Sequence, residues 1–249
     1  MKISPLIKIT SSIAIIAICL FMISATHRAA KPKVLIFSKT NGFRHASIPV
    51  GIAAIKKLGE ENNFDVDATE DSTQFNNDNL KKYSVLVFLS PTGKVFGPDE
   101  EKALQQYIHN GGGYVGIHAA TDCEYNWQWY GDLVGGYFAR HPKQQMAKFI
   151  VVDKNNPATS FLPDVWERFD ELYNFKYLNP QIHVLIKIDE KSYSPGDGAM
   201  GDNHPMCWCH EYEGGRAFYT ELGHTDESYA DPNYLKHVLG GIQWAMGKK

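Results

Sequence analysis

The strongest constraint on the fold is the alternation of short apolar runs with amphipathic segments in the first half of the chain. Residues 34–38, 85–89 and 114–118 are short runs of mostly apolar residues, typical of strands buried on both faces of a parallel sheet. Residues 98–110 begin with proline and acidic residues and carry their apolar side chains on one face, as a helix does. This order predicts an α/β fold with a doubly wound, mostly parallel sheet and helices on both faces.

The second half of the chain has a less regular pattern. Residues 149–152, 183–188 and 216–221 have the composition of strands, and residues 232–246 have that of a closing helix. The aromatic-rich segment 135–202 is expected to cover the carboxyl edge of the sheet, where ligands bind in such folds. The chain has 249 residues and no internal repeat or low-complexity linker, so we expect residues 31–249 to form one α/β domain.

Residues 1–30 have the pattern of a secretory leader. Lys2 and Lys8 precede an apolar run at 13–23, and the small residues Ser24 and Ala25 follow it. The run is shorter than the about 20 apolar residues that a membrane-spanning helix needs, so no stable membrane insertion is expected after cleavage. The pattern predicts a signal peptide and export, to the periplasm of a bacterium.

Net charge limits the kinds of binding partner, and cysteine spacing limits the kinds of metal site. The net charge is −3 and the lysines and arginines are scattered, so we expect no nucleic-acid partner. Leader cleavage would leave Cys123, Cys207 and Cys209, an odd number that lacks the paired spacing of a zinc knuckle. We expect these thiols to be buried as small apolar side chains. The sequence is compatible with a homo-oligomer.

The segment GGGYVGIHAATD, residues 111–122, predicts a turn, a strand and the start of a helix. That order is typical of a catalytic elbow, in which the residue at the tip of the strand faces the substrate. A nucleophilic elbow has serine or cysteine at this position, whereas this chain has His118. An imidazole at the tip can act as a general acid or base near neutral pH, or as a metal ligand.

Other polar residues are expected near the same edge of the sheet. Arg44 and His45 follow the first predicted strand, and Arg44 can bind an anionic oxygen or be an ordinary surface residue. Asp122 can orient an imidazole, bind a sugar hydroxyl or cap a helix. Trp127 follows the elbow and can stack on the face of a sugar.

Seven blocks of the chain, in order, resemble one known family. They are FSKTNGFRH, GGGYVGIHAATD, VGGYFARHP, DELYNF, DNHPMCW, GRAFYTELGH and GIQWAMG, and they extend over residues 33–247. The chain resembles the ThuA-like (trehalose-utilisation) family, which is similar in its flavodoxin-like fold to class I glutamine amidotransferases. The amidotransferase elbow carries a nucleophilic cysteine where this chain has His118. Since imidazole cannot form the glutamyl thioester, glutamine amidotransferase activity is not expected.

The resemblance also implies which further residues meet at the carboxyl edge. It adds His141, His204 and His224, and it selects Glu171 rather than its neighbour Asp170, because adjacent residues of an extended segment face opposite sides. The candidate catalytic residues are therefore His118, Glu171, His45 and His224, and the candidate substrate-binding residues are Arg44, Asp122, His141, His204 and Trp127.

The resemblance links the chain to trehalose and related disaccharides that are processed through 3-keto sugars. A ketone acidifies the neighbouring C–H, so a histidine or glutamate can remove that proton if an electrophile stabilises the enolate oxygen. The electrophile can be a divalent metal, or an imidazolium with Arg44, and the sequence leaves the cofactor open. We expect an exported isomerase or lyase for a small carbohydrate substrate. The alternatives are a non-catalytic glycan-binding module and a metal-dependent glycoside hydrolase, although the chain lacks an HExxH motif.

Overall fold

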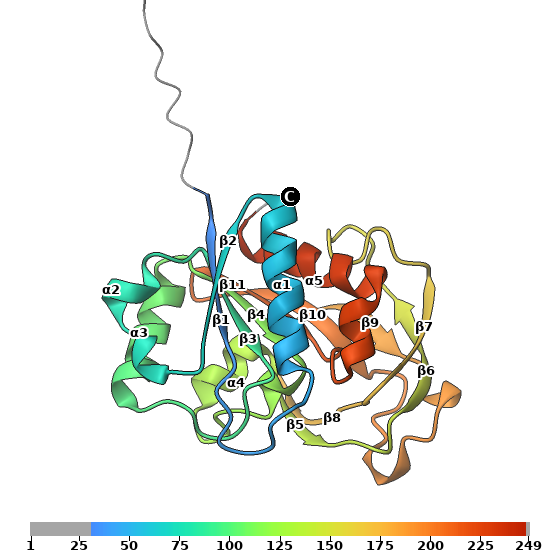
Figure 1. Ribbon diagram of the computed structural model, residues 1–249. Coiled ribbons are helices and arrows are strands. Elements are labelled where there is room, and N and C mark those ends of the chain that lie inside the picture. Colours follow the sequence, from blue (N-terminus) through green and yellow to red (C-terminus); the bar gives the residue numbers. More distant parts are fainter. Residues whose placement is uncertain (1–30, 248–249) are drawn as a thin grey trace, which may run out of the picture. The chain divides into compact units, whose positions relative to one another are not determined.

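A nine-stranded sheet forms the centre of the computed structural model, which describes residues 31–247 (Figure 1). The strand order is β2-β1-β3-β4-β11-β10-β9-β6-β7. The strands of the parallel half are β1 (Lys33–Phe37), β2 (Asp65–Thr69), β3 (Val85–Leu89), β4 (Gly113–Ile117) and β11 (Gly215–Thr220). The remaining strands pair antiparallel and are β10 (Pro205–Tyr212), β9 (His183–Ile188), β6 (Gln145–Val151) and β7 (Val165–Asp170).

Helices cover both faces of the sheet. The helices α1 (Ile48–Asn62) and α5 (Pro232–Ala245) lie side by side on one face (Figure 1), while α3 (Pro98–His109) and α4 (Gln128–Val134) pack on the other. Strand β1 shows why the sheet needs two layers: Val34 and Ile36 join one apolar core, and Leu35 and Phe37 join the other. All four side chains are buried, because a parallel strand inside such a fold contacts helices on both faces.

Shorter elements connect and flank the main sheet. A separate two-stranded antiparallel sheet pairs β5 (Gly136–Arg140) with β8 (Asn174–Leu178). The short helices are α2 (Asn77–Leu80), η1 (Ser72–Gln74), η2 (His118–Thr121), η3 (Glu190–Ser192), η4 (Gly196–Gly198) and η5 (Asp226–Ala230).

The predicted α/β class, with a large parallel sheet and helices on both faces, is confirmed. The expectation that segment 135–202 covers the carboxyl edge is met only in part. Its loops bring Glu171 and His141 to His118 at that edge, whereas β6, β7 and β9 extend the sheet. In β7, buried and exposed residues alternate, as in an antiparallel strand with one face in water. Here the pairing of distant strands, rather than local composition, determines the architecture.

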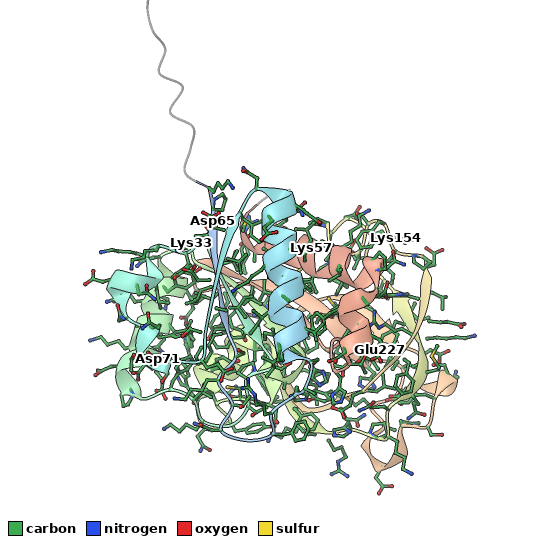
Figure 2. The ribbon with its side chains drawn as sticks, viewed as in Figure 1. Lys33, Lys57, Asp65, Asp71, Lys154 and Glu227 are labelled. Atoms are coloured by element: carbon green, nitrogen blue, oxygen red, sulfur yellow. The ribbon has the colours of Figure 1, made fainter. Side chains whose placement is uncertain are left out.

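Several further expectations concern the surface and the termini. The predicted signal peptide, residues 1–30, lies outside the described residues. Within residues 31–247, no helix is long and apolar enough to cross a membrane. Cys123, Cys207 and Cys209 are buried free thiols, as predicted. Charged side chains such as Lys57 and Lys154 lie on the outer surface (Figure 2), which is consistent with a water-facing exterior over the helices.

Candidate functional site

The elbow at the end of β4 holds a buried histidine in an unusual backbone conformation. His118 is the first residue after β4, begins η2 and has φ +51°, in the left-handed region that non-glycine residues seldom adopt. Its Nδ1 lies 2.7 Å from the backbone oxygen of Glu221. Since a carbonyl only accepts hydrogen bonds, Nδ1 carries the proton, and a neutral His118 therefore presents a lone pair on Nε2.

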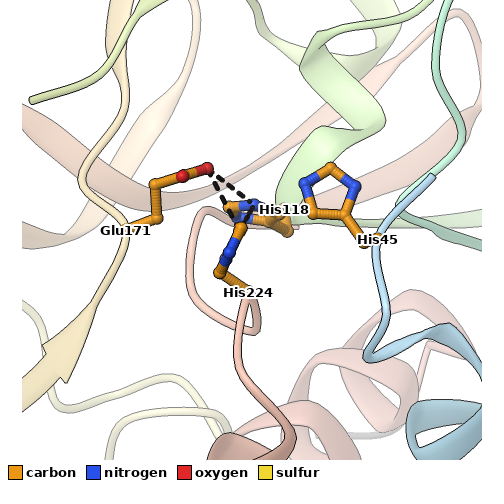
Figure 3. A group of neighbouring side chains, drawn as sticks. All are labelled: His45, His118, Glu171 and His224. Atoms are coloured by element: carbon orange, nitrogen blue, oxygen red, sulfur yellow. Dashed lines mark hydrogen bonds and ion pairs between the residues drawn. The ribbon is translucent and has the colours of Figure 1, made fainter. Parts of the chain in front are cut away.

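Three side chains converge at that Nε2. His118 Nε2 lies 3.4 Å from Glu171 Oε2 and 3.1 Å from His224 Nδ1, and His224 Nδ1 lies 3.1 Å from Glu171 Oε2. The ring of His45 stands 4.7 Å from that of His118 and 5.1 Å from that of His224. Figure 3 shows the four side chains arriving from four separate segments of the chain. The loops after β1, β4, β7 and β11 therefore meet at one place.

The cluster contains a charged pair. Burial raises the pKa of Glu171, but the neighbouring imidazoles of His118 and His224 more than offset it and hold this pKa well below its usual range. Burial lowers the pKa of His224, yet the hydrogen bond and the charge of Glu171 leave it raised overall. Glu171 is thus a carboxylate that favours the protonated form of His224. Their mutual attraction persists because both groups are largely removed from solvent.

His45 has a different electrostatic state from its neighbours. Burial, with smaller contributions from the neighbouring His118 and His224, lowers the pKa of His45 to about 3, so its imidazole is neutral near pH 7. Its Nδ1 is buried and has no hydrogen-bond partner among the described residues. One nitrogen of His45 lies within 4.8 Å of the other three candidate ligand atoms. The cluster therefore contains an uncharged nitrogen donor beside an ion pair.

Two buried carboxyl groups support the cluster from outside. Asp170 accepts hydrogen bonds from the backbone N–H groups of Gly223 and His224, each at 3.1 Å, and so fixes the loop that carries His224. Glu221 accepts the backbone N–H of Tyr173 at 3.1 Å. Burial and the charge of Asp170 raise the pKa of Glu221 well above its usual value, which favours the neutral form of this carboxyl group. These carboxyl groups position the cluster without belonging to it.

Two further side chains lie against the cluster. His141 is partly exposed, and its Nδ1 lies 3.3 Å from Glu171 Oε1. The amide nitrogen of Gln144 lies 2.7 Å from His224 Nε2. Gln144 was not singled out by the sequence, because a glutamine in a loop has no distinctive pattern.

An aromatic ring lies beside His45 at the surface. Phe43 is 67% exposed, and its ring is 4.9 Å from that of His45. Such an exposed ring next to a polar cluster offers an apolar face to a ligand. The sequence contains Phe43 within the block FSKTNGFRH, but composition alone did not distinguish it from a core aromatic residue.

Arg44 and Trp127, two of the predicted substrate-binding residues, contact side chains outside the histidine cluster. Arg44 forms a half-exposed ion pair with Glu70, with Nη2 2.7 Å from Oε1. Trp127 precedes α4 and stacks on Trp129, with ring centroids 5.1 Å apart. No hydrogen bond, ion pair or ring contact within residues 31–247 joins either residue to the histidine cluster.

His204 and Asp122, two more of the five predicted substrate-binding residues, also bind neighbouring groups. His204 is fully buried, with Nε2 2.8 Å from the carbonyl oxygen of Tyr173 and Nδ1 2.8 Å from Glu190. It therefore lies behind the cluster and supports the segment that follows Glu171. Asp122 ends η2 and accepts the hydroxyl of Tyr125 at 2.5 Å. Burial raises the pKa of Asp122, although this tyrosine bond opposes the shift.

A surface cavity of about 510 Å³ opens next to the cluster. None of the four cluster residues lines it, but Gln144, which contacts His224, and Thr225, which follows His224 in the chain, both do. The other lining residues are Arg168, Phe169, Glu227, Ser228 and Asp231. Its volume is within the about 300–1,000 Å³ of small-molecule pockets. A cavity of about 530 Å³ between α2 and α3 has no titratable cluster of this kind and lies away from the elbow.

The cluster also has the composition of a metal site. His45, His118, Glu171 and His224 each offer one ligand atom, and the four atoms lie within 4.8 Å of one another. Imidazole nitrogens and a carboxylate oxygen are ligands that zinc and related divalent ions accept. The same four residues can therefore transfer protons or hold a cation.

The chain matches one family along nearly all of its described length. The family model ThuA, described as trehalose utilisation, matches residues 33–245. A ThuA-like protein from Bacteroides uniformis ATCC 8492 is 25% identical, with 88% of this chain and 92% of that chain covered and a TM-score of 0.74. A ThuA-like protein from Parabacteroides merdae ATCC 43184 is 23% identical, with 88% and 91% covered and a TM-score of 0.71.

A more distant similarity shows the fold alone. The β-galactosidase from Bacillus circulans sp. alkalophilus is 12% identical, with 88% of this chain but 32% of that chain covered and a TM-score of 0.58. No curated protein matches the chain.

Proposed function

Because the chain belongs to the ThuA family, described as trehalose utilisation, we propose that it is a carbohydrate-processing enzyme. Its proposed substrate is a keto-sugar or keto-disaccharide of the trehalose type, and its proposed reaction is enolisation by acid–base catalysis. The observation that carries this proposal is the buried Glu171–His224 pair beside Nε2 of His118. Nε2 of His118 can accept a proton, and the neighbouring His224 can hold positive charge because it pairs with Glu171.

The proposed reaction uses the acidity of a C–H bond next to a ketone. His118 accepts this proton on Nε2, because its Nδ1 already donates to the Glu221 carbonyl. The C–H electrons form the C=C bond of an enediolate, and the carbonyl π electrons move to its oxygen. The His224 imidazolium, held by Glu171, stabilises that oxygen. General acid–base catalysis of this kind typically contributes about 10²–10⁴-fold to the rate.

Two outcomes follow from the same enediolate. For an isomerase, His224 gives a proton to the former carbonyl oxygen and takes the proton of the neighbouring hydroxyl. His118 then returns its proton to the former carbonyl carbon, and the ketone moves to the neighbouring position. If the glycosidic oxygen on the adjacent carbon leaves with its bonding electrons and a proton from His224, the glycosidic bond breaks and the enzyme is a lyase. Atoms and charge balance in both cases, and neither needs an oxidant or reductant.

The surroundings of the cluster support a sugar-sized substrate. The cavity of about 510 Å³ beside Gln144 and Thr225 offers polar groups for hydroxyls. Phe43 presents an exposed ring next to His45, and such a ring can stack on the C–H face of a pyranose. We include export in the proposal, on the leader pattern of residues 1–30. Mass analysis of the periplasmic and cytosolic fractions of an expressing bacterium tests it: a cytosolic product that keeps these residues contradicts export.

Deuterium exchange tests the reaction directly. The purified protein is incubated in D₂O with 3-keto-trehalose or with trehalose, and the products are followed by NMR. We expect deuterium on the carbon next to the ketone, followed by a moved carbonyl or a cleaved glycosidic bond, and no exchange in trehalose. His183→Ala is a matched control, because His183 is an exposed histidine paired with Asp153.

The same experiment separates the alternatives. Binding of the keto-sugar without exchange would replace the proposal with a glycan-binding module. Cleavage of trehalose without prior oxidation would indicate a hydrolase.

A further inference from the structure

The three ligand atoms of His118, His224 and Glu171 form a nearly equilateral triangle. Its edges are 3.1 Å between the two nitrogens, 3.1 Å from His224 Nδ1 to Glu171 Oε2, and 3.4 Å from His118 Nε2 to Glu171 Oε2. A divalent ion with bonds of about 2.1 Å separates its ligand atoms by about 3.0 Å at right angles and about 3.4 Å at tetrahedral angles. All three edges fall in this interval.

We infer that His118, His224 and Glu171 bind a divalent transition-metal ion, with His45 as a fourth ligand. One nitrogen of His45 lies within 4.8 Å of the other ligand atoms, so this imidazole must move closer to them to complete the set. Three imidazoles and one carboxylate favour Zn²⁺, Co²⁺, Ni²⁺ or Fe²⁺ over Mg²⁺ and Ca²⁺, which prefer oxygen ligands. This inference rests on geometry and does not require the keto-sugar substrate.

The hydrogen bonds around the triangle orient its ligand atoms. The Glu221 carbonyl accepts the Nδ1 proton of His118, which fixes the tautomer with a lone pair on Nε2. Gln144 contacts Nε2 of His224 on the side away from the triangle. For Nδ1 to bind the ion, Nε2 must carry the proton, so the amide of Gln144 must turn its oxygen toward Nε2. Asp170 holds the backbone of His224 through its N–H group. Outer hydrogen bonds of this kind orient metal ligands in proteins and raise their basicity.

A bound ion changes the roles proposed for the cluster. It would supply the positive charge that stabilises an enolate oxygen, in place of the His224 imidazolium. His118 and His224 would then be ligands rather than proton carriers. His141, which lies outside the ligand set and 3.3 Å from Glu171, would be the histidine left to transfer a proton.

Metal binding can be measured without any substrate. The purified full chain is stripped with a chelator, dialysed and titrated with Zn²⁺ by calorimetry and with Co²⁺ by visible absorption. We expect about one equivalent of either ion, a ligand-field band for Co²⁺ and a higher melting temperature. Loss of an outer hydrogen bond lowers metal affinity about 10–100-fold, so loss of a ligand should lower it at least that much.

The variants His224→Ala and Glu171→Gln remove one ligand each. His210→Ala is the matched control, since His210 is a buried histidine bonded to the carbonyl of Asp132 and absent from the cluster. Circular dichroism confirms that each variant is folded before it is titrated. We expect weaker metal binding in the two ligand variants and wild-type binding in the control.

The outcomes distinguish this inference from the proposed function. Less than a tenth of an equivalent of bound ion in the folded wild type, or unchanged affinity in both ligand variants, overturns the metal site. If the protein binds metal but catalyses no deuterium exchange in the keto-sugar, the metal site is supported and the proposed reaction is contradicted. If the chelator-treated protein binds no metal but still catalyses deuterium exchange in the keto-sugar, the proposed reaction is supported and the metal site is contradicted.

Discussion

Replacement of His118 tests both its proposed role in catalysis and its contribution to the stability of the elbow. His118→Ala removes the imidazole next to Glu171 and His224 and also the N–H that donates to the Glu221 carbonyl over 2.7 Å. A buried carbonyl that loses its donor costs about 1–3 kcal/mol. In a domain of this size 1 kcal/mol lowers Tm by about 2–4 °C, so we expect Tm to fall by about 2–12 °C.

The expected loss of activity is much larger than the loss of stability. Without the imidazole, the rate of deuterium exchange in the keto-sugar should fall at least about 100-fold, because acid–base catalysis typically contributes about 10²–10⁴-fold. His118→Asn is the matched variant, since asparagine tolerates the left-handed φ of +51° better than alanine and retains an amide donor. It should recover part of the Tm and none of the exchange rate.

Thermal melts and NMR rates measured on the same preparations separate the two effects. Rates are expressed per folded molecule at a temperature well below every Tm. A variant with a lowered Tm and a near-normal exchange rate would refute the reasoning, because the histidine would then only stabilise the elbow. An unchanged Tm with lost exchange would instead show that the hydrogen bond to Glu221 contributes little to stability.

Three further predictions concern the surroundings of the site. Phe43→Ala should raise KM for the keto-sugar about 2–13-fold with kcat nearly unchanged, because removal of a stacking ring costs about 0.5–1.5 kcal/mol. Steady-state kinetics check this, and a lower kcat with constant KM would oppose it. Asp170→Asn removes the carboxylate that pairs with the buried Arg168, Nη2 to Oδ2 at 3.2 Å, and that accepts from the backbone of Gly223 and His224. Because it leaves the Arg168 charge without this partner, the free energy of unfolding should fall by about 3–5 kcal/mol in urea titrations. Burial lowers the pKa of His237 to about 4, so the unfolded chain binds a proton that the folded chain excludes between about pH 6.5 and 4. Acidification through that window should lower the free energy of unfolding by about 3 kcal/mol, and His237→Gln should flatten this dependence; an unaltered pH profile in the variant would count against it.

The parallel half of the fold could be predicted from the sequence because its strands are buried on both faces. The runs at β1, β3 and β4 are continuous and apolar, and each is followed by a turn and a helical pattern. Their carboxyl ends lie at one edge by the geometry of parallel sheets. The position of His118 at the tip of β4 follows from the same local pattern.

The antiparallel half could not be predicted in the same way. Strand β10 includes Cys207 and Cys209 and pairs with β9 through register shifts, so its apolar residues do not alternate cleanly. The edge strand β7 alternates, but its pairing with β6 depends on a partner that lies elsewhere in the chain. Pairing of this kind is a tertiary property and leaves only a weak local signal.

Most residues of the site could not be identified from spacing or composition in the sequence either. Glu171 and His224 were placed at the edge through the family resemblance, since no spacing in the sequence brings the two together. Asp170, Glu221 and Gln144 are ordinary polar residues until their hydrogen bonds are seen. Only the folded chain distinguishes a carboxyl group that positions a loop from one that faces solvent.

The register of two neighbouring strands explains why the elbow of this fold can hold a histidine. Ile117 of β4 pairs with Thr220 of β11, so the next residue of each strand, His118 and Glu221, lie side by side. This pairing brings the Glu221 carbonyl to the Nδ1 of His118, while the hydroxyl of Tyr219 donates to the carbonyl of His118 at 2.8 Å. Two hydrogen bonds from β11 thus offset the strain of the left-handed residue.

The same strand also delivers the second histidine. After Glu221 the chain turns at Gly223, whose φ is +113° and where a Cβ would stand 2.2 Å from the hydroxyl of Tyr234. Only glycine fits this turn, which returns His224 to within 3.1 Å of His118. Strand β11 pairs parallel with β4 and antiparallel with β10, so it is where the two halves of the sheet join. The cluster is therefore a product of that junction: β4 supplies one histidine, β11 positions it and supplies the other, and the end of the antiparallel half supplies Glu171.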